Sequence, residues 1–351
     1  MASRDGTTQF LSRMRGLVLR TLRPLIGDAP RVALVDFPDY TNVGDSLIWL
    51  GSLKTLELLG VNAPVYVASQ RNYRRDEMAR AVGDGVICIQ GGGNLGDLWP
   101  AHQEFREQVI RDFPANRIIQ LPQSVEFSSP QALDRARRVF GAHRDLTILV
   151  RTERSFARAE AFGVPTQLCP DLGMAMGVLD RPHAPTHDAV LLARTDHESQ
   201  GLPLDIVPPW IQRVDWVGKP GGLALRMMDT LHQRPKLWRA VSGSSRHLLF
   251  RSAAHRRLQY GMDLLSRGRV VITDRLHGHV LAMLLGVPHC VMDSQFGKVR
   301  ALWDTWTHEA ADAVWCDTLG EAIERAREIV GRQPSGAERR TPRVERRELG
   351  V

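Results

Sequence analysis

The sequence of 351 residues is poor in cysteine and in aromatic residues. Its four cysteines, Cys88, Cys169, Cys290 and Cys316, are far apart and form no CxxC pair. This spacing argues against a disulfide framework and a structural zinc site, and it fits a reducing compartment. Aromatic residues make up 6% of the chain and do not alternate with basic residues, so a platform for stacking single-stranded nucleic acid has little support. We expect no nucleic-acid partner.

The sequence also lacks a long apolar run. Its most apolar stretch, residues 276–292, contains three histidines, two glycines and a proline, whereas a membrane-spanning helix needs about 20 apolar residues in a row. Near the N-terminus, Arg13, Arg15, Arg20 and Arg23 interrupt the apolar residues too often for a secretory signal. We therefore expect a cytoplasmic protein.

The chain does contain enough apolar sequence for two folded units. Hydrophobic residues make up 43% of it and charged residues 24%, which excludes disorder for most of the chain. The length suggests two domains. The net charge is +7, with much of the excess at residues 4–31 and 339–347, and this distribution favours contact with anionic surfaces or ligands.

Residues 1–30 contain a predicted amphipathic helix. Arg13, Arg20 and Arg23 lie on its polar face. Its apolar face is formed by Phe10, Leu11, Met14, Leu17, Val18, Leu22 and Leu25. This pattern fits a helix docked on its own domain. It also fits a helix that lies on a membrane surface, where basic residues flank the apolar face.

Short apolar runs alternate with helical patterns along most of the remaining chain, and this alternation is typical of a doubly wound parallel sheet. After Asp180 the segment RPHAPTH resembles a linker, and the alternation then resumes. We predict an α/β fold with two Rossmann-like domains, residues 31–180 and 181–331, and ligands in the cleft between them at the carboxyl ends of strands. The basic tail, residues 332–351, is expected to be disordered.

Two loops that follow predicted strands are candidates for ligand binding. In Asn42-Val43-Gly44-Asp45, the glycine permits a tight turn and Asp45 or Ser46 can cap the next helix. In the run Gly91-Gly92-Gly93-Asn94-Leu95-Gly96-Asp97, three glycines would expose backbone amides as an anion-binding nest does. The run is neither a Walker A loop nor a GxGxxG fingerprint. Both loops also fit ordinary turns that bind no ligand.

Basic side chains follow two other predicted strands. Arg275 and His277 come directly after the strand 270–273 and suit a dianionic ligand, because arginine clamps an anion and histidine can move a proton. A metal site at His277 and His279 is not favoured, since residues two apart diverge on a helix. Arg151, after the strand 146–150, would form a second anion clamp. A purely structural role remains the alternative for each of these residues.

Taken together, these segments resemble the polysaccharide pyruvyl transferase family. The matching pieces, in chain order, are NVGD at 42–45, QGGGNLGD at 90–97, LPQSVEF at 121–127, the R-x-x-x-S of 151–155, PDLGMAM at 170–176 and TDRLHGHVLAMLLGVP at 273–288. The resemblance implies a glycosyltransferase-B-like fold. It also implies transfer of pyruvate, as a ketal, from phosphoenolpyruvate to a sugar of a bacterial exopolysaccharide or cell-surface glycan. Thr152 departs from the family, which often has aspartate after the first arginine.

The resemblance implies a role for each candidate residue. Arg275 and Arg151 would bind the carboxylate and phosphate of the donor, and His277 would act as general acid or contact the phosphate. Asp45 or Asp97 would be the base for an acceptor hydroxyl. Contacts with substrate are further expected from Asn42, Gly91, Gly92, Gly93, Asn94 and Lys298. No metal or cofactor is required.

The resemblance also implies partners for the protein. We expect a glycan or a lipid-linked oligosaccharide as acceptor, and peripheral contact of the N-terminal helix with the inner membrane face, where such glycans are assembled. Two alternatives stay open. One is a glycosyltransferase that uses a nucleotide sugar, and the other is a non-catalytic, membrane-associated binding protein.

Overall fold

The computed structural model describes residues 2–28, 31–194, 199–216 and 220–332. It contains two sheets, and every strand pair in this part of the chain is parallel. The predicted α/β class with parallel sheets is therefore confirmed. All but one residue of the tail 332–351 lies outside the described residues.

The first sheet has seven strands in the order β2-β1-β3-β5-β6-β7, with β4 paired to β5. The runs VALV and VICI are buried throughout because helices cover both faces. The strands are β1 Val32–Val35, β2 Tyr66–Ala68, β3 Val86–Ile89, β4 Gly92–Gly96, β5 Ile118–Glu126, β6 Leu146–Val150 and β7 Thr166–Leu168. The helices that follow are α2 Val43–Leu58, α3 Arg75–Val82, α4 Pro100–Asp112, α5 Pro130–Gly141, α6 Glu153–Ala159, η1 Glu160–Phe162 and η2 Leu172–Met176.

The second sheet has five strands in the order β12-β11-β10-β8-β9. Its strands are β8 His187–Leu192, β9 Ile211–Val214, β10 Gly268–Thr273, β11 His289–Val291 and β12 Ala313–Trp315. Its longer helices are α7 Leu223–Gln233, α8 Gly243–Ser266, α9 Leu276–Leu284, α10 Lys298–Thr305 and α11 Leu319–Arg332. Three short helices, η3 Leu204–Ile206, η4 Pro235–Ala240 and η5 Thr307–Glu309, complete this half.

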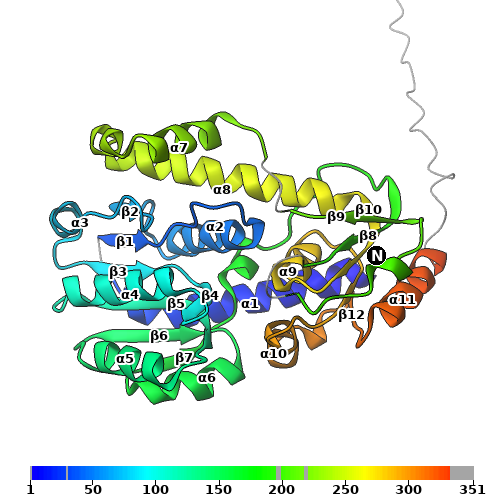
Figure 1. Cartoon of the computed structure of the whole chain (residues 1–351), viewed down its shortest axis with the longest axis horizontal. Helices are drawn as coiled ribbons and strands as arrows, with labels where there is room; N and C mark the ends of the chain where they lie inside the picture. Colours follow the sequence, from blue (N-terminus) through cyan, green and yellow to red (C-terminus); the bar gives the residue numbers. More distant parts are fainter. Residues whose placement is uncertain (1, 29–30, 195–198, 217–219, 333–351) are drawn as a thin grey trace, which may run out of the picture.

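Helix α8 joins the two halves of the chain. It begins at Gly243, where the Ser242 side chain accepts a hydrogen bond from the backbone N–H of Ser245. Its early turns pack on the first sheet, with the rings of Phe250 and Phe37 stacked 4.0 Å apart. Arg257 donates a hydrogen bond to the carbonyl oxygen of Pro38 (2.6 Å). The second half of the chain thus holds the loop that follows β1, and α8 lies beside α2 (Figure 1).

The predicted N-terminal helix is confirmed as α1 Ala2–Ile26. Its apolar stripe is buried inside the protein: Phe10, Leu11, Met14, Val18, Leu22 and Ile26 are all at most 5% exposed. The helix is therefore docked on its own chain. The prediction that this apolar face contacts a membrane is wrong, because protein already covers it. Within the described residues, no helix is long and apolar enough to cross a membrane.

A pair of buried histidines links α9 to β11. His279 Nδ1 lies 2.7 Å from His289 Nε2, and both side chains are fully buried. The pair continues to the Thr307 hydroxyl on one side (2.8 Å) and to the Val287 carbonyl on the other (2.8 Å). His279 thus lies in the packed interior. Among the described residues, no three His, Cys, Asp or Glu side chains are grouped so as to hold a metal ion.

This histidine pair should make the protein less stable in mild acid. Burial lowers the pKa of His289 to about 4 and that of His279 well below its ordinary value. The unfolded chain, with histidine pKa near 6.5, therefore binds more protons below that pH, so unfolding becomes easier as the pH falls from about 6.5 toward 4. Between pH 7.5 and 5.5 the pair should account for a loss of about 2–3 kcal/mol in the free energy of unfolding.

Urea denaturation at the two pH values would measure this loss. In the double variant His279→Gln/His289→Gln, the free energy of unfolding should fall by about 2–3 kcal/mol less between the two pH values than in the wild type. In His308→Gln, at an exposed histidine of η5, it should fall as in the wild type. Equal pH dependence in the two variants would contradict the prediction.

Candidate active site

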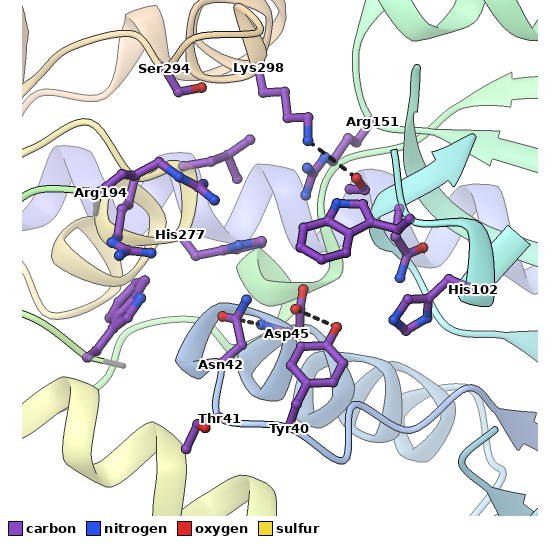
Figure 2. Close-up of a pocket in the computed structure, with 16 residues that line it drawn as sticks. Tyr40, Thr41, Asn42, Asp45, His102, Arg151, Arg194, His277, Ser294 and Lys298 are labelled. Atoms are coloured by element: carbon purple, nitrogen blue, oxygen red, sulfur yellow. Dashed lines mark hydrogen bonds between the residues drawn. The ribbon is translucent and has the colours of Figure 1, made fainter. Parts of the chain in front are cut away.

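One pocket, of about 270 Å3, lies where strands of both sheets end. Its walls come from β4 itself and from the segments that follow β1, β4, β6, β8, β9, β10 and β11, as expected for ligand sites at the carboxyl ends of parallel strands. Figure 2 shows the side chains that converge on it. The lining residues are Tyr40, Thr41, Asn42, Asp45, Gly93, Asn94, Trp99, His102, Arg151, Arg194, Trp216, Arg275, Leu276, His277, Ser294 and Lys298.

The structure brings most of the predicted site residues together in this pocket. They come from segments that are far apart in the sequence and that meet only in the folded chain. Those that line it are Asn42, Asp45, Gly93, Asn94, Arg151, Arg275, His277 and Lys298.

Three predicted residues do not line the pocket. Gly91 packs against the chain itself, since a Cβ there would lie 2.6 Å from the Pro122 carbonyl oxygen. Gly92 begins β4 with a left-handed φ of 137°, which favours glycine. Asp97 accepts hydrogen bonds from the backbone N–H groups of Ser128 and Ser129 (both 2.8 Å). Asp97 therefore holds the turn that leads into α5 and is not in position to act as a base in this pocket.

The glycine run is not the open nest that the sequence predicts. Residues 92–96 form the short strand β4, which pairs with β5. The backbone N–H of Asn94 is already bound to Gln123 Oε1 (3.1 Å). Gly93 has a different role, because a Cβ there would lie 3.1 Å from Arg151 Nη2. The missing side chain makes room for a guanidinium group.

Asn42 rather than Asp45 caps helix α2. Its side-chain oxygen accepts hydrogen bonds from the backbone N–H groups of Gly44 (2.8 Å) and Asp45 (3.4 Å). The carboxylate of Asp45 instead accepts a hydrogen bond from the Tyr40 hydroxyl (2.8 Å). Asp45 is thus the carboxylate that lines the pocket, with a tyrosine as its partner.

A buried carboxylate joins the two predicted donor-binding residues. Asp171 Oδ2 lies 2.7 Å from Arg151 Nη1 and 3.3 Å from His277 Nε2. Burial alone would raise the pKa of Asp171, but the neighbouring His277 and Arg151 outweigh it and hold the pKa well below its ordinary value. Ser124 accepts a further hydrogen bond from Arg151 Nε (2.9 Å). This ionised carboxylate therefore fixes both side chains.

The imidazole of His277 lies directly against the start of α2. A Cβ atom at Gly44 would be 2.5 Å from His277 Nδ1. The first turns of α2 and α9 thus meet at this point, and the positive ends of both helix dipoles lie at the pocket. Glycine is needed here for close approach rather than for an unusual φ.

Gly44→Ala should therefore misplace His277. We expect it to lower kcat/KM for the expected donor, phosphoenolpyruvate, by about 10²-fold, since a small displacement of a reacting group lowers the rate strongly. The matched control is Gly320→Ala, the second residue of α11 as Gly44 is of α2, because a Cβ there would lie 3.9 Å from its nearest neighbour, Thr318 Oγ1. Steady-state kinetics on both purified variants would test this. Wild-type kcat/KM in Gly44→Ala would contradict the proposed contact.

Arg275 is held at the start of α9 by two residues that follow β9. Its Nη2 lies 3.3 Å from Asp215 Oδ1, and its guanidinium lies over the Trp216 ring at 5.6 Å from the centroid. Asp274 accepts a hydrogen bond from the backbone N–H of Arg194 (2.8 Å), and burial raises its pKa to about 6. Arg194 thereby enters the pocket as a cation that the sequence motifs do not reveal.

A second histidine that the motifs do not reveal lies on another wall. His102 Nδ1 is 3.0 Å from Asp36 Oδ1. Burial lowers the pKa of His102, but the Asp36 carboxylate outweighs burial and raises it. Asp36 follows β1 and has a φ of 69°, in the left-handed region that non-glycine residues rarely adopt. Such strain is often found at functional sites. The φ of Asp36 therefore marks this position as a candidate site residue, but a φ angle is a signal that the sequence does not carry.

The lining carries far more positive than negative charge. Arg151, Arg194, Arg275 and Lys298 face a single lining carboxylate, Asp45. Lys298 Nζ lies 3.4 Å from the Gly93 carbonyl oxygen, which places it on the same wall as Arg151. Such a pocket suits a small molecule with more than one anionic group.

Comparisons with known proteins point to one family. The model of the family "Polysaccharide pyruvyl transferase" matches residues 42–295. "Pyruvyl transferase 1" of Schizosaccharomyces pombe is 34% identical over 298 residues, which cover 79% of this chain and 70% of that protein. "Putative pyruvyl transferase EpsO" of Bacillus subtilis is 28% identical, over 87% of this chain and 93% of that protein.

A solved structure shares the fold. It belongs to a functionally uncharacterized protein of Klebsiella pneumoniae, with 16% sequence identity and a TM-score of 0.57. The match covers 87% of this chain and 99% of that one.

Proposed function

The chain belongs to the polysaccharide pyruvyl transferase family, and from this premise we propose that it transfers pyruvate from phosphoenolpyruvate to two hydroxyls of one sugar as a ketal. The observation that carries the proposal is the convergence of four cations and the imidazole of His277 on a single pocket. Phosphoenolpyruvate has a carboxylate and a phosphate close together. Such a donor needs two cationic contacts on opposite sides, and the pocket supplies both.

We place the donor between two walls of the pocket. Arg194 lies on one side, Arg151 and Lys298 lie across from it, and His277 is between them (Figure 2). Arg275 follows β10 as Arg194 follows β8, and it lines the same pocket. Arginine clamps a planar carboxylate or a phosphate with two parallel hydrogen bonds. Lysine provides a point charge that suits a phosphate oxygen. No metal or cofactor takes part in this scheme.

The reaction requires one proton to be delivered and two to be removed. His277 gives a proton to the methylene carbon of phosphoenolpyruvate, and a sugar hydroxyl adds to the neighbouring carbon, C2, as it loses its own proton. The bond from C2 to the phosphate oxygen then breaks, and phosphate leaves. A second hydroxyl adds to C2 and gives up its proton, which closes the ketal. Asp45, hydrogen-bonded to Tyr40, is our candidate for the group that accepts a hydroxyl proton.

The acceptor sugar is expected to bind at the wall formed by Tyr40, Trp99 and His102. Aromatic rings offer an apolar surface with polar groups at the edge, and the hydroxyls of a sugar need both. The acceptor we propose is a bacterial exopolysaccharide or cell-surface glycan, free or as a lipid-linked oligosaccharide, modified in the cytoplasm at the inner membrane face.

The decisive experiment is incubation with phosphoenolpyruvate and candidate glycans while phosphate release and glycan mass are followed. Phosphoenolpyruvate should also raise the melting temperature, because a ligand that binds the folded state stabilises it. A rise caused by a nucleotide sugar and not by phosphoenolpyruvate would instead favour a glycosyltransferase. Absence of phosphate release with every glycan, despite donor binding, would favour a non-catalytic binding protein.

A further inference from the structure

The exposed side chains of α7 and the adjoining η4 include both basic and large apolar groups. Three large apolar side chains are exposed there: Leu223 by 68%, Met227 by 48% and Leu237 by 44%. The exposed charged side chains of the same segment, residues 223–240, are Arg226, Arg234, Lys236, Arg239 and, as the one acidic residue, Asp229. We call this exposed surface the α7–η4 face.

Helix α7 is anchored to the protein by one side, and its opposite side is exposed. Met228 and Leu231 are buried and pack in the core, while Leu223, Arg226 and Met227 share the opposite side of the helix by their spacing. In η4 the Trp238 ring is buried, and its neighbours Leu237 and Arg239 are exposed. Helix α7 lies at the outer edge of the molecule, with α8 between it and α2 (Figure 1). The exposed apolar side chains thus lie on an outermost element.

We infer that the α7–η4 face binds the surface of an anionic lipid membrane. Basic side chains are attracted to anionic headgroups, and apolar side chains among them insert at the boundary of the acyl chains. A second copy of this chain would bring like charges together, which opposes self-association through this face. A polyanionic glycan or an acidic protein would pair with the basic side chains, but the three large apolar side chains would then contact a polar partner.

Helix α7 adjoins one wall of the pocket by its inner side, opposite the α7–η4 face. On α7, His232 Nε2 lies 3.3 Å from Asp39 Oδ2, and Asp39 immediately precedes the pocket residues Tyr40 and Thr41. Attachment through α7 would therefore hold the loop after β1 near the membrane. If the proposed function is right, a lipid-linked sugar would reach the acceptor wall from there. The membrane binding itself does not depend on the reaction.

Vesicle sedimentation with the full-length protein would test the inference. The probes are vesicles of phosphatidylcholine alone and vesicles with about one third phosphatidylglycerol, near physiological salt. The test variant is Arg226→Glu/Lys236→Glu/Arg239→Glu. The control variant is Arg137→Glu/Arg138→Glu/Arg144→Glu, which changes the charge by the same amount at exposed positions in and just after α5, on the far side of the molecule (Figure 1).

We expect wild-type protein and control to sediment with the anionic vesicles and to bind neutral ones at least tenfold less. The partition of the test variant onto the anionic vesicles should be at least tenfold lower than that of the wild type. The variant Met227→Ser/Leu237→Ser should also bind these vesicles more weakly. If the triple glutamate variant does not fold, the triple glutamine variant replaces it. Three results would overturn the inference: equal partition of the test and control variants, unchanged binding of the serine variant, or no binding of the wild-type protein. Phosphate release from phosphoenolpyruvate by the unbound enzyme reports on the proposed function separately.

Discussion

His277→Ala should lower kcat by about 10²–10⁴-fold, with little change in the KM for phosphoenolpyruvate, because general acid catalysis by a positioned side chain contributes a factor of this size. The imidazole lies between the carboxylate of Asp171 and the first turn of α2. It is thereby oriented toward the space between the four cations. Steady-state kinetics on phosphoenolpyruvate with an accepted glycan would measure the effect.

The matched control for this variant is His308→Ala, at an exposed histidine outside the pocket. It should keep wild-type kcat and KM. A rise in KM with unchanged kcat in His277→Ala would mean that the imidazole only contacts the phosphate. Wild-type kinetics in a folded His277→Ala variant would remove the histidine from the reaction.

Asp171→Asn should affect both stability and activity. The side chains of Asp171 and Arg151 are at most 2% exposed, and removal of one partner of a buried ion pair costs about 3–5 kcal/mol in the free energy of unfolding. His277 also loses the carboxylate that lies 3.3 Å from its Nε2, so its ring is no longer fixed. We expect kcat/KM for phosphoenolpyruvate to fall by about 10²-fold, because small displacements of a reacting group are costly.

Normalising kcat/KM to the amount of folded protein separates a positioning role from a merely structural one, because loss of folded protein alone then leaves kcat/KM unchanged. Asp97→Asn is the matched control: it removes a carboxylate that fixes a backbone turn outside the pocket. That variant should keep the kcat/KM of the wild type. Wild-type kcat/KM in folded Asp171→Asn would contradict the positioning role.

The sequence reveals the fold class well because the signals for it are local. Runs such as VALV and VICI are typical of buried strands on hydrophobicity alone, and the structure confirms them as β1 and β3. Helix α1 shows the limit of such local signals. An apolar stripe predicts that one face is covered, but sequence spacing does not distinguish a protein core from a lipid surface. The covering segments include η2, which lies far along the chain.

The candidate site is predictable where charged residues directly follow a strand. Arg151, Arg275 and His277 meet that condition, and all three line the pocket. Asp171 lies within the PDLGMAM motif, but its role depends on side chains 20 and 106 residues away, which sequence spacing does not reveal. Gly91 and Gly92 show the opposite error, a predicted contact that the fold does not make. A glycine run can mark close packing of backbone, as it does beside Pro122, as well as ligand binding.

The placement of α1 also constrains how the chain can fold as it leaves the ribosome. This helix is synthesised before the segments that cover it, and its contacts become available at widely separated times. Its end can meet Arg117 early and its middle Ala175 later, whereas Thr7 must wait for Asp312, 305 residues further along. The nascent protein therefore carries a partly uncovered apolar helix through most of translation. The contacts of α1 are complete only when nearly all of the second sheet has been synthesised.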